Sequence, residues 1–143
     1  MRDLRRLSQF AARLKRKLPE EANRLASQVA RQLIIELTEE TPVDTGVAVS
    51  NWRVITGDMP TGEIYAHEPG YRGSTRSTNI AIAVAIALQY ISGKKPGQPI
   101  RVVNSAHHII SLNYGTSKQA PAGFIDSAIV RAQLMLRAER LKL

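Results

Sequence analysis

The chain contains no cysteine and has few aromatic residues. Its 143 residues include one Trp, four Tyr and two Phe. The absence of cysteine excludes disulfides, thiolate metal sites and cysteine nucleophiles. Because aromatics are scarce, the core must be built mainly from Leu, Ile, Val and Ala, and Trp52 is its natural anchor. The length predicts a single domain that covers residues 1–143.

Long hydrophobic runs are also missing. The longest uninterrupted apolar run covers residues 80–88, which is too short to span a bilayer as a helix. No secretory signal is evident. The Arg-rich start resembles a transit peptide, but its apolar spacing continues into a helical pattern, so we interpret it as part of the folded protein. We therefore expect no membrane partner.

Positive charge is concentrated at the start of the chain. The net charge is +8, and residues 1–17 carry seven Lys or Arg against Asp3 alone. Residues 18–40 carry five Glu against two Arg. This asymmetry indicates docking on an anionic surface, either nucleic acid or an acidic protein face, although a solvated basic helix explains it equally well. The candidate interface residues here are Arg5, Arg6, Arg13, Lys15, Arg16 and Lys17.

Helical periodicity dominates residues 1–40, which form an N-terminal helical segment. Apolar residues recur at spacings of three and four, which predicts an amphipathic helix. Pro19 interrupts the pattern, so the segment is either two helices or one long helix kinked near Pro19. The apolar positions before the proline are Leu4, Leu7, Phe10, Ala11, Leu14 and Leu18.

The rest of the chain alternates short strands, loops and helices. Residues 51–56 and 100–103 are strand candidates by β-propensity, and residues 57–78 read as a long loop. Residues 80–91 alternate large residues with Ala, but the Ala content favours a helix, with N-caps at Ser77, Thr78 or Asn79 and a C-cap at Gly93. A last helix is predicted over residues 124–141.

Asp44-Thr45-Gly46 is the most tempting catalytic signal. Homodimeric aspartic proteases use this tripeptide, with two Asp carboxylates sharing a proton. Here Thr41-Pro42 precedes it instead of an apolar strand, and the expected second supporting segment is not evident. The alternative is a turn in which Asp44 accepts backbone N–H groups and Gly46 supplies the bend.

Other signals of catalysis are weak. His67, His107 and His108 show no metal-ligand spacing. No phosphate-binding loop, dinucleotide fingerprint or nucleophile elbow is present. The sequence therefore predicts a protein without enzymatic activity, cofactor or metal.

Two separated segments resemble a known family. Residues 41–46 (TPVDTG), followed by Asn51-Trp52, are similar to the first signature of the tail-completion proteins of long-tailed bacteriophages. A strand ending at Asn104, followed by residues 112–124 (LNYGTSKQAPAGF), is similar to their second signature. The two segments occur in the family's order and at a suitable separation, and with the intervening helix the resemblance covers roughly residues 38–130. The chain departs from the family at residues 104–108, where relatives often carry a Pro-Tyr pair.

The resemblance implies an α+β fold, in which a small, mostly antiparallel sheet is packed by the long N-terminal helical segment, a middle helix and a C-terminal helix. It also implies a structural protein of the virion neck. This protein forms a six-fold ring of itself in the host cytoplasm, between the head connector or adaptor and the tail-tube or tail-terminator proteins, with DNA passing through the lumen.

The expected structural residues of these motifs are Pro42, Asp44, Thr45, Gly46, Trp52, Asn104, Tyr114, Gly115, Pro121, Gly123 and Phe124. Further candidate interface residues are Tyr71, Arg72, Arg76, Thr116, Ser117, Lys118 and Gln119. Two alternatives stay open, namely a packaging protein that binds DNA without sequence preference and, less favoured, an aspartic protease using Asp44.

Overall fold

The computed structural model describes residues 2–60 and 62–139. Within them the chain forms one long helix, several shorter helices and a two-stranded sheet, which confirms the α+β class. The elements in chain order are α1 (Arg2–Glu40), α2 (Val47–Ser50), β1 (Trp52–Ile55), α3 (Arg76–Ser92), β2 (Arg101–Asn104), α4 (Ile109–Asn113) and α5 (Phe124–Ala138).

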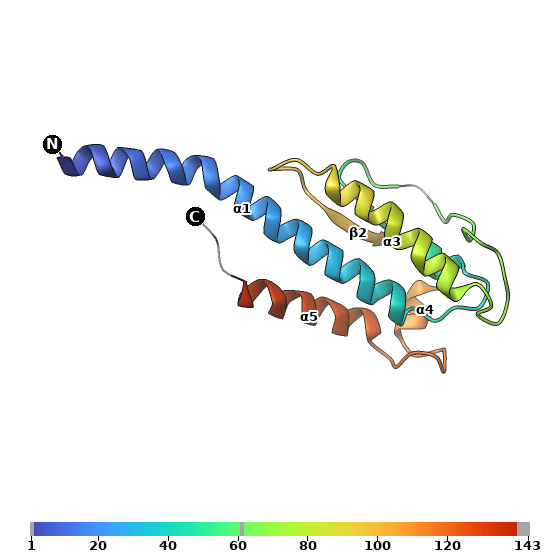
Figure 1. Cartoon of the computed structure of the whole chain (residues 1–143). Coiled ribbons are helices and arrows are strands. Elements are labelled where there is room, and N and C mark those ends of the chain that lie inside the picture. The colour runs from blue at the N-terminus through green and yellow to red at the C-terminus, as the bar shows by residue number, and fades with distance from the viewer. Residues whose placement is uncertain (1, 61, 140–143) are drawn as a thin grey trace.

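The N-terminal helical segment is one helix, not two. α1 has 39 residues and contains Pro19, so its length is roughly 58 Å at 1.5 Å per residue. Proline removes one backbone hydrogen bond from the helix interior and crowds the preceding turn. The helix accommodates it by bending gently where the dark-blue first part in Figure 1 gives way to the lighter blue.

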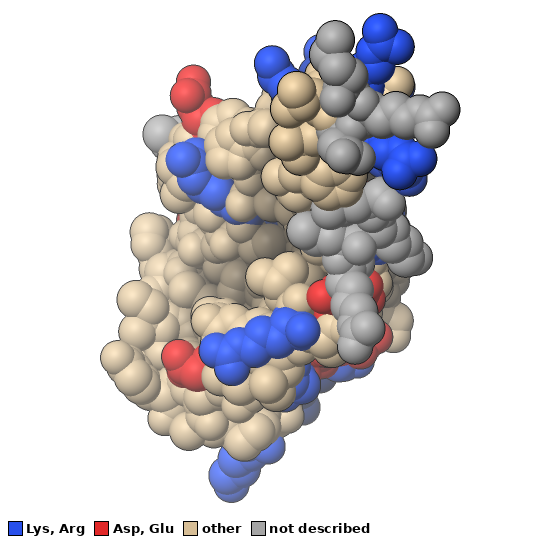
Figure 2. Space-filling model, turned by 90° about the vertical axis from the view of Figure 1, so that its left-hand side faces the viewer, with Lys and Arg blue, Asp and Glu red and all other residues tan. Residues whose placement is uncertain are grey.

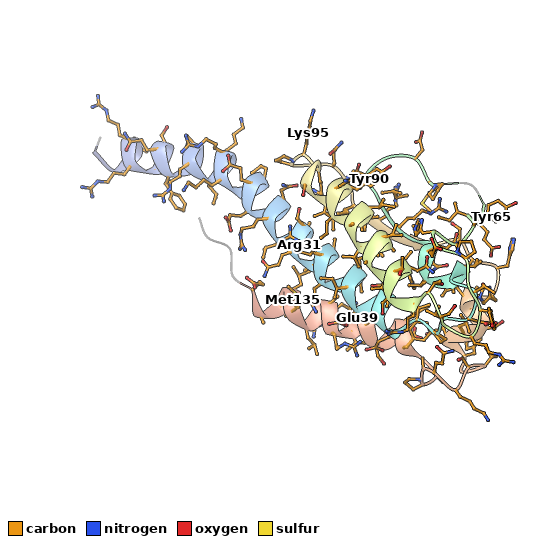
Figure 3. The ribbon with its side chains drawn as sticks, turned by 45° about the vertical axis from the view of Figure 1, so that its right-hand side comes forward. Arg31, Glu39, Tyr65, Tyr90, Lys95 and Met135 are labelled. Atoms are coloured by element: carbon orange, nitrogen blue, oxygen red, sulfur yellow. The ribbon has the colours of Figure 1, made fainter. Side chains whose placement is uncertain are left out.

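Only the second half of α1 is packed. α3 and α5 lie along it on opposite sides (Figure 1), and both contact it. Ala30, Ile34 and Leu37 of α1 are buried there. We call residues 4–18 the arm, because they extend beyond the other elements with side chains projecting around the helix (Figure 3). On the arm, Leu4 and Leu7 are 69% and 63% exposed.

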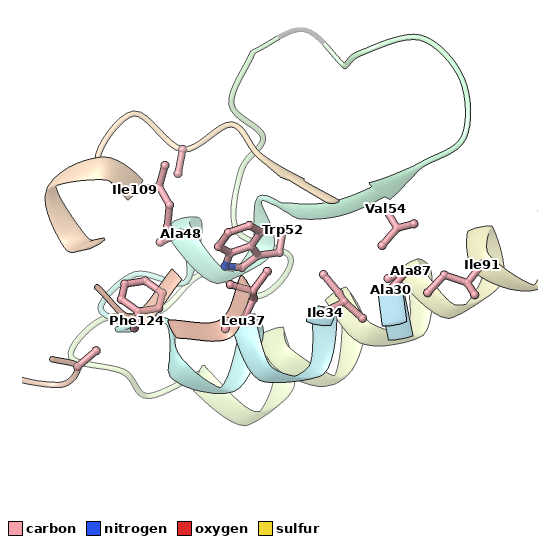
Figure 4. Packing of buried hydrophobic residues seen from close by; sticks show 13 residues of the cluster. Ala30, Ile34, Leu37, Ala48, Trp52, Val54, Ala87, Ile91, Ile109 and Phe124 are labelled. Atoms are coloured by element: carbon pink, nitrogen blue, oxygen red, sulfur yellow. The ribbon is translucent and has the colours of Figure 1, made fainter. Parts of the chain in front are cut away.

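The two strands form an antiparallel pair whose inner side completes the core. Trp52 pairs with Asn104 at one end of the register, and the indole is buried among core residues of α1 and α5 (Figure 4). Its Nε1–H donates to the Thr41 hydroxyl at 2.7 Å. Phe124 at the start of α5 is 1% exposed in the same cluster. Trp52 and Phe124 therefore hold β1 and α5 against α1.

α3 is helical as predicted for residues 80–91, but it begins earlier. It starts at Arg76 with Thr75 as its N-cap, so the predicted capping residues Ser77, Thr78 and Asn79 lie inside the helix. The long loop consequently ends at residue 75 instead of 78. The predicted cap was wrong because Asn79 lies in the first turn of the helix, where its side chain bonds to the Thr75 hydroxyl and to both backbone groups of Glu68 in the long loop.

One further helix and one helix end also differ from expectation. α2 was not predicted, because four residues are too few to show helical periodicity. α5 ends at Ala138, and Glu139 is extended with φ −75° and ψ 145°. The helix therefore stops before the predicted end at 141, and residues 140 and 141 lie outside the described part of the chain.

Candidate functional site

The two motif segments, far apart in the sequence, are joined by direct hydrogen bonds. The Gln119 side chain accepts the Val43 N–H through Oε1 at 2.9 Å. Its Nε2 donates to the Val43 carbonyl at 3.1 Å. One amide side chain thus satisfies both backbone groups of a buried residue, as a neighbouring strand would. We call residues 41–46 and 112–124 together the motif corner.

A third segment ties into the motif corner through Asp44. The carboxylate Oδ1 accepts the Arg72 N–H at 2.6 Å, and the Asp44 carbonyl accepts the Gly73 N–H at 3.0 Å. The next carbonyl, that of Thr45, accepts the Gly70 N–H at 3.2 Å. Asp44 and Thr45 are both exposed. In this geometry the Asp44 carboxylate holds a turn of the long loop.

Gly46 occupies a position that no other residue fits. Its φ is +95°, and a Cβ built there would lie 2.3 Å from Nδ2 of Asn79. Asn79 is fully buried. Its Oδ1 accepts the Ser50 hydroxyl and the Glu68 N–H, while its Nδ2 donates to the Glu68 carbonyl and to the Thr75 hydroxyl. Asn79 therefore fixes the long loop behind the motif corner.

The second half of the motif corner closes on itself. The exposed Tyr114 leads into Gly115, whose φ is +93° and whose missing Cβ would lie 3.1 Å from Cβ of Ala122. The Gly123 N–H then donates to the Asn113 carbonyl at 2.6 Å. The loop that carries the exposed Pro121 is thus pinched at its base, directly before α5 begins.

Asn113 also fixes the beginning of α5. Its Oδ1 accepts the Ile125 N–H at 3.0 Å, and its Nδ2 donates to the Asp126 carboxylate at 2.8 Å. A helix start leaves backbone N–H groups without intrahelical partners. Asn113 supplies one such partner from the preceding helix, so α4 and α5 are linked at a fixed angle.

Asn104 has the equivalent role at the end of β2. Its Nδ2 donates to the Ala48 carbonyl at 2.8 Å, and its Oδ1 accepts the Ala106 N–H at 2.9 Å. The strand end is therefore bonded to α2 and to the turn that follows it.

A hollow of about 390 Å³ lies between the two halves of the motif corner. Among its lining residues only Asp44 and His108 can titrate. The lining residues are Pro42, Asp44, Thr45, Gly46, Val47, Ala48, His108, Leu112, Ser117 and Gln119.

The predicted interface residues fall into two groups. Arg76 and Gln119 line one surface hollow beside the motif corner, and the Arg76 guanidinium donates to the Glu39 carbonyl. Tyr71 and Arg72 lie on the adjoining loop, where the guanidinium lies 6.0 Å from the ring centre. Thr116 and Lys118 are exposed, and Ser117 is half-buried.

The second group consists of the basic arm residues at the far end of α1. Lys17 is half-buried. The other five are exposed, namely Arg5, Arg6, Arg13, Lys15 and Arg16.

Three asparagines that the sequence analysis did not select organise this region. Besides Asn79 and Asn113, Asn51 donates to the Ile64 carbonyl at 2.9 Å and accepts the Ile64 N–H at 2.9 Å. Asn51 and Asn113 both lie inside the quoted motifs, and that position was the available signal. The sequence pattern marked Asn79 only as a possible helix cap.

Burial lowers the pKa of His67, which lies on the long loop, and a backbone hydrogen bond with Ser50 has a smaller effect that raises it.

Among the described residues, no group of three His, Asp or Glu side chains is placed to hold a metal ion. No helix in the same residues has the length and apolar character needed to cross a membrane. Comparison with family models, curated proteins and solved structures finds no match for this chain.

Proposed function

We propose that this chain is a structural subunit of the bacteriophage neck. In this role it forms a ring that completes the tail and joins it to the head connector, with DNA passing through the lumen. The observation that carries the proposal is the motif corner, where Gln119 bonds both backbone groups of Val43. The two segments that resemble tail-completion proteins are thereby parts of one rigid unit.

The outer surface of the motif corner suits a contact between subunits. Its loop is pinched by the bond between Gly123 and Asn113, and it presents exposed Thr116, Lys118 and Pro121. Loops held by a rigid scaffold often carry recognition. A cyclic ring uses heterologous contacts, in which one surface meets a different surface of the neighbour. We assign the loop 116–122 to such a contact.

In this proposal the arm makes a different contact from that of the motif corner. Its exposed Arg and Lys side chains stand about one helix length from the motif corner. A projecting basic helix can reach the acidic rim of an adjacent ring or the DNA in the lumen, where contacts with phosphates weaken steeply as salt rises. The neighbouring proteins are then the head connector or adaptor on one side and the tail-tube or tail-terminator protein on the other.

A phage that lacks this gene tests the proposal. We expect electron micrographs of its lysates to show filled heads and separate tails, and expression of the full chain to restore joined virions. Lys118→Glu should restore fewer joined virions, whereas Gln89→Glu, an exposed change on α3 outside the motif corner, should match the unaltered chain. Joined virions in the absence of the protein refute the proposal.

The alternatives predict different results. A DNA-packaging protein binds duplex DNA as an isolated subunit, with an affinity that falls steeply with salt. An aspartic protease cleaves peptides, and Asp44→Asn abolishes the cleavage. The bond from the Arg72 N–H to Asp44 supports the turn, in which this carboxylate accepts backbone N–H groups.

A further inference from the structure

An apolar groove runs along α1 next to the arm. Its volume is about 580 Å³. The floor is one side of α1, and the walls come from β2 and from Leu136 of α5. Leu18, Ala22, Leu25, Val29 and Leu33 follow one another along the floor. Figure 2 looks at this end of the molecule and shows a central hollow with tan, uncharged residues in and beside it and blue Lys and Arg side chains farther out.

The arm continues the groove floor into solvent. Leu4, Leu7, Leu14 and Leu18 lie on the side of α1 that also carries the floor residues, because they follow the same three- and four-residue spacing. Leu4 and Leu7 are more than 60% exposed. An apolar stripe of this length on a protein surface marks an interaction site.

The stripe is symmetric about Leu18. Ala11 and Leu14 precede Leu18 by seven and four residues, and Ala22 and Leu25 follow it by four and seven. Leu7 and Val29 extend the same symmetry to eleven residues on each side. Two identical helices that lie antiparallel and cross at Leu18 therefore bring the apolar residues from Leu7 to Val29 of one stripe against apolar residues of the other, whereas Leu4 falls opposite Gln32.

We propose that the groove binds the arm of a second copy of this chain, and that the two α1 helices pair antiparallel about Leu18. Each arm then occupies the groove of the other copy, so that Leu7 of one copy meets Val29 of the other. The contact is reciprocal, with the same surface on both subunits.

The arm cannot reach the groove of its own chain. α1 is one continuous helix through Pro19. Leu7 and Val29 are 22 residues apart on it, which is roughly 33 Å at 1.5 Å per residue. Only a different molecule can place the arm over Val29 while α1 stays helical.

Charge near the centre of the pairing also favours a second copy. Antiparallel pairing about Leu18 sets Lys15 and Arg16 of one copy at the level of Glu21 and Glu20 of the other, so opposite charges meet near the centre.

The pairing goes beyond the proposed neck role and does not require it. It uses the apolar side of α1 and leaves the arm's outward basic side and the motif corner uncovered. Pairing is a property of the isolated protein, whereas the neck role is scored as joined virions. The two proposals can therefore fail separately.

Cysteine cross-linking tests the register, because the natural chain has no cysteine. A disulfide requires Cα atoms within about 7 Å. We expect mild oxidation to link the full-length double variant Leu7→Cys/Val29→Cys into covalent dimers, and Leu18→Cys to link at the two-fold axis. Leu7→Cys alone should stay monomeric on a denaturing gel, and so should Gln9→Cys/Val29→Cys. Efficient linking of Leu7→Cys alone indicates parallel pairing and overturns the proposal.

A charge variant tests the surface. Leu7→Asp/Leu14→Asp places two carboxylates on the stripe, and Gln9→Asp/Ala12→Asp adds the same charge away from it. In analytical ultracentrifugation we expect the first variant to raise the dimer dissociation constant by at least tenfold and the control to leave it within about twofold. Circular dichroism monitors helix content in both.

Two results overturn the proposal. One is an unaltered chain that stays monomeric at 100 μM, whether or not it binds duplex DNA or vesicles of anionic phospholipid. The other is a dimer that both charge variants leave intact, since its interface then lies elsewhere.

Discussion

Replacing Gln119 by Ala tests how much the motif corner depends on one side chain. The change removes the two hydrogen bonds to Val43, at 2.9 and 3.1 Å. Val43 is 1% exposed, and a buried backbone group left without a partner costs roughly 1–3 kcal/mol. Because Gln119 itself is exposed, water can replace part of what is lost. We therefore expect the free energy of unfolding to fall by about 2 kcal/mol in total.

Urea denaturation followed by circular dichroism measures this loss. At a slope of roughly 2 kcal/mol per molar urea, the midpoint should fall by about 1 M. The midpoint of Gln119→Glu should lie between those of the unaltered chain and Gln119→Ala, because its carboxylate accepts the Val43 N–H but cannot donate to the Val43 carbonyl. Lys118→Ala is the matched control, and an exposed change of this kind is expected to stay within about 0.5 kcal/mol.

The reasoning is refuted if Gln119→Ala unfolds at the same urea concentration as Lys118→Ala. The two halves of the motif corner would then be held by packing alone. A loss in Gln119→Glu equal to that in Gln119→Ala would show instead that the bond to the Val43 carbonyl carries the effect.

Three further predictions concern buried polar groups. Asn79→Ala leaves the Glu68 N–H without its partner and should lower the free energy of unfolding by roughly 2–4 kcal/mol in urea. Trp52→Phe keeps an aromatic ring but removes the donor to Thr41, so a loss of about 1 kcal/mol is expected from the same measurement. Burial lowers the pKa of His67 below its ordinary 6.5. The unfolded chain therefore binds a proton there more readily, and stability falls as pH drops below about 6.5 towards the lowered folded-state pKa. His67→Gln should remove that part of the pH dependence, as thermal melts across pH 5–8 will show.

Each of these has a contrary result. Equal stability of Asn79→Ala and the unaltered chain would mean that the long loop is held elsewhere. A Trp52→Phe variant without loss would assign the role of the indole to packing alone. An unchanged pH profile in His67→Gln would move the titration to another group.

The periodic elements could be predicted from the sequence, because a buried helix face repeats over many residues. α1 was recognised from its stripe, whereas α3 was predicted from its Ala content against an alternation of large and small residues that is typical of a strand. Ala83 and Ala87 are buried, and their small side chains let α3 pack closely on its neighbours. Even so, the pattern could not decide whether Pro19 divides α1, because that depends on how much the packed half of the helix stabilises the whole.

The candidate site was only partly predictable. The motif residues Asp44, Gly46 and Gly123 could be selected because turns demand particular residue types. The tie between Gln119 and Val43 could not, because it joins residues 76 positions apart and follows only from the tertiary arrangement. Asn79 was predicted to cap a helix from its local sequence, but it lies inside the helix and its side chain also bonds both backbone groups of Glu68.

The continuity of α1 gives one helix two very different local stabilities. Amides near Ile34 and Leu37 can exchange with solvent only when the core opens, whereas those of residues 4–18 have little beyond the helix itself to protect them. An unsupported helix of that length is marginal in water. Hydrogen exchange read residue by residue should therefore show a steep rise in protection along α1 between Leu14 and Leu25, and any molecule that settles on the arm will move this step towards the N-terminus.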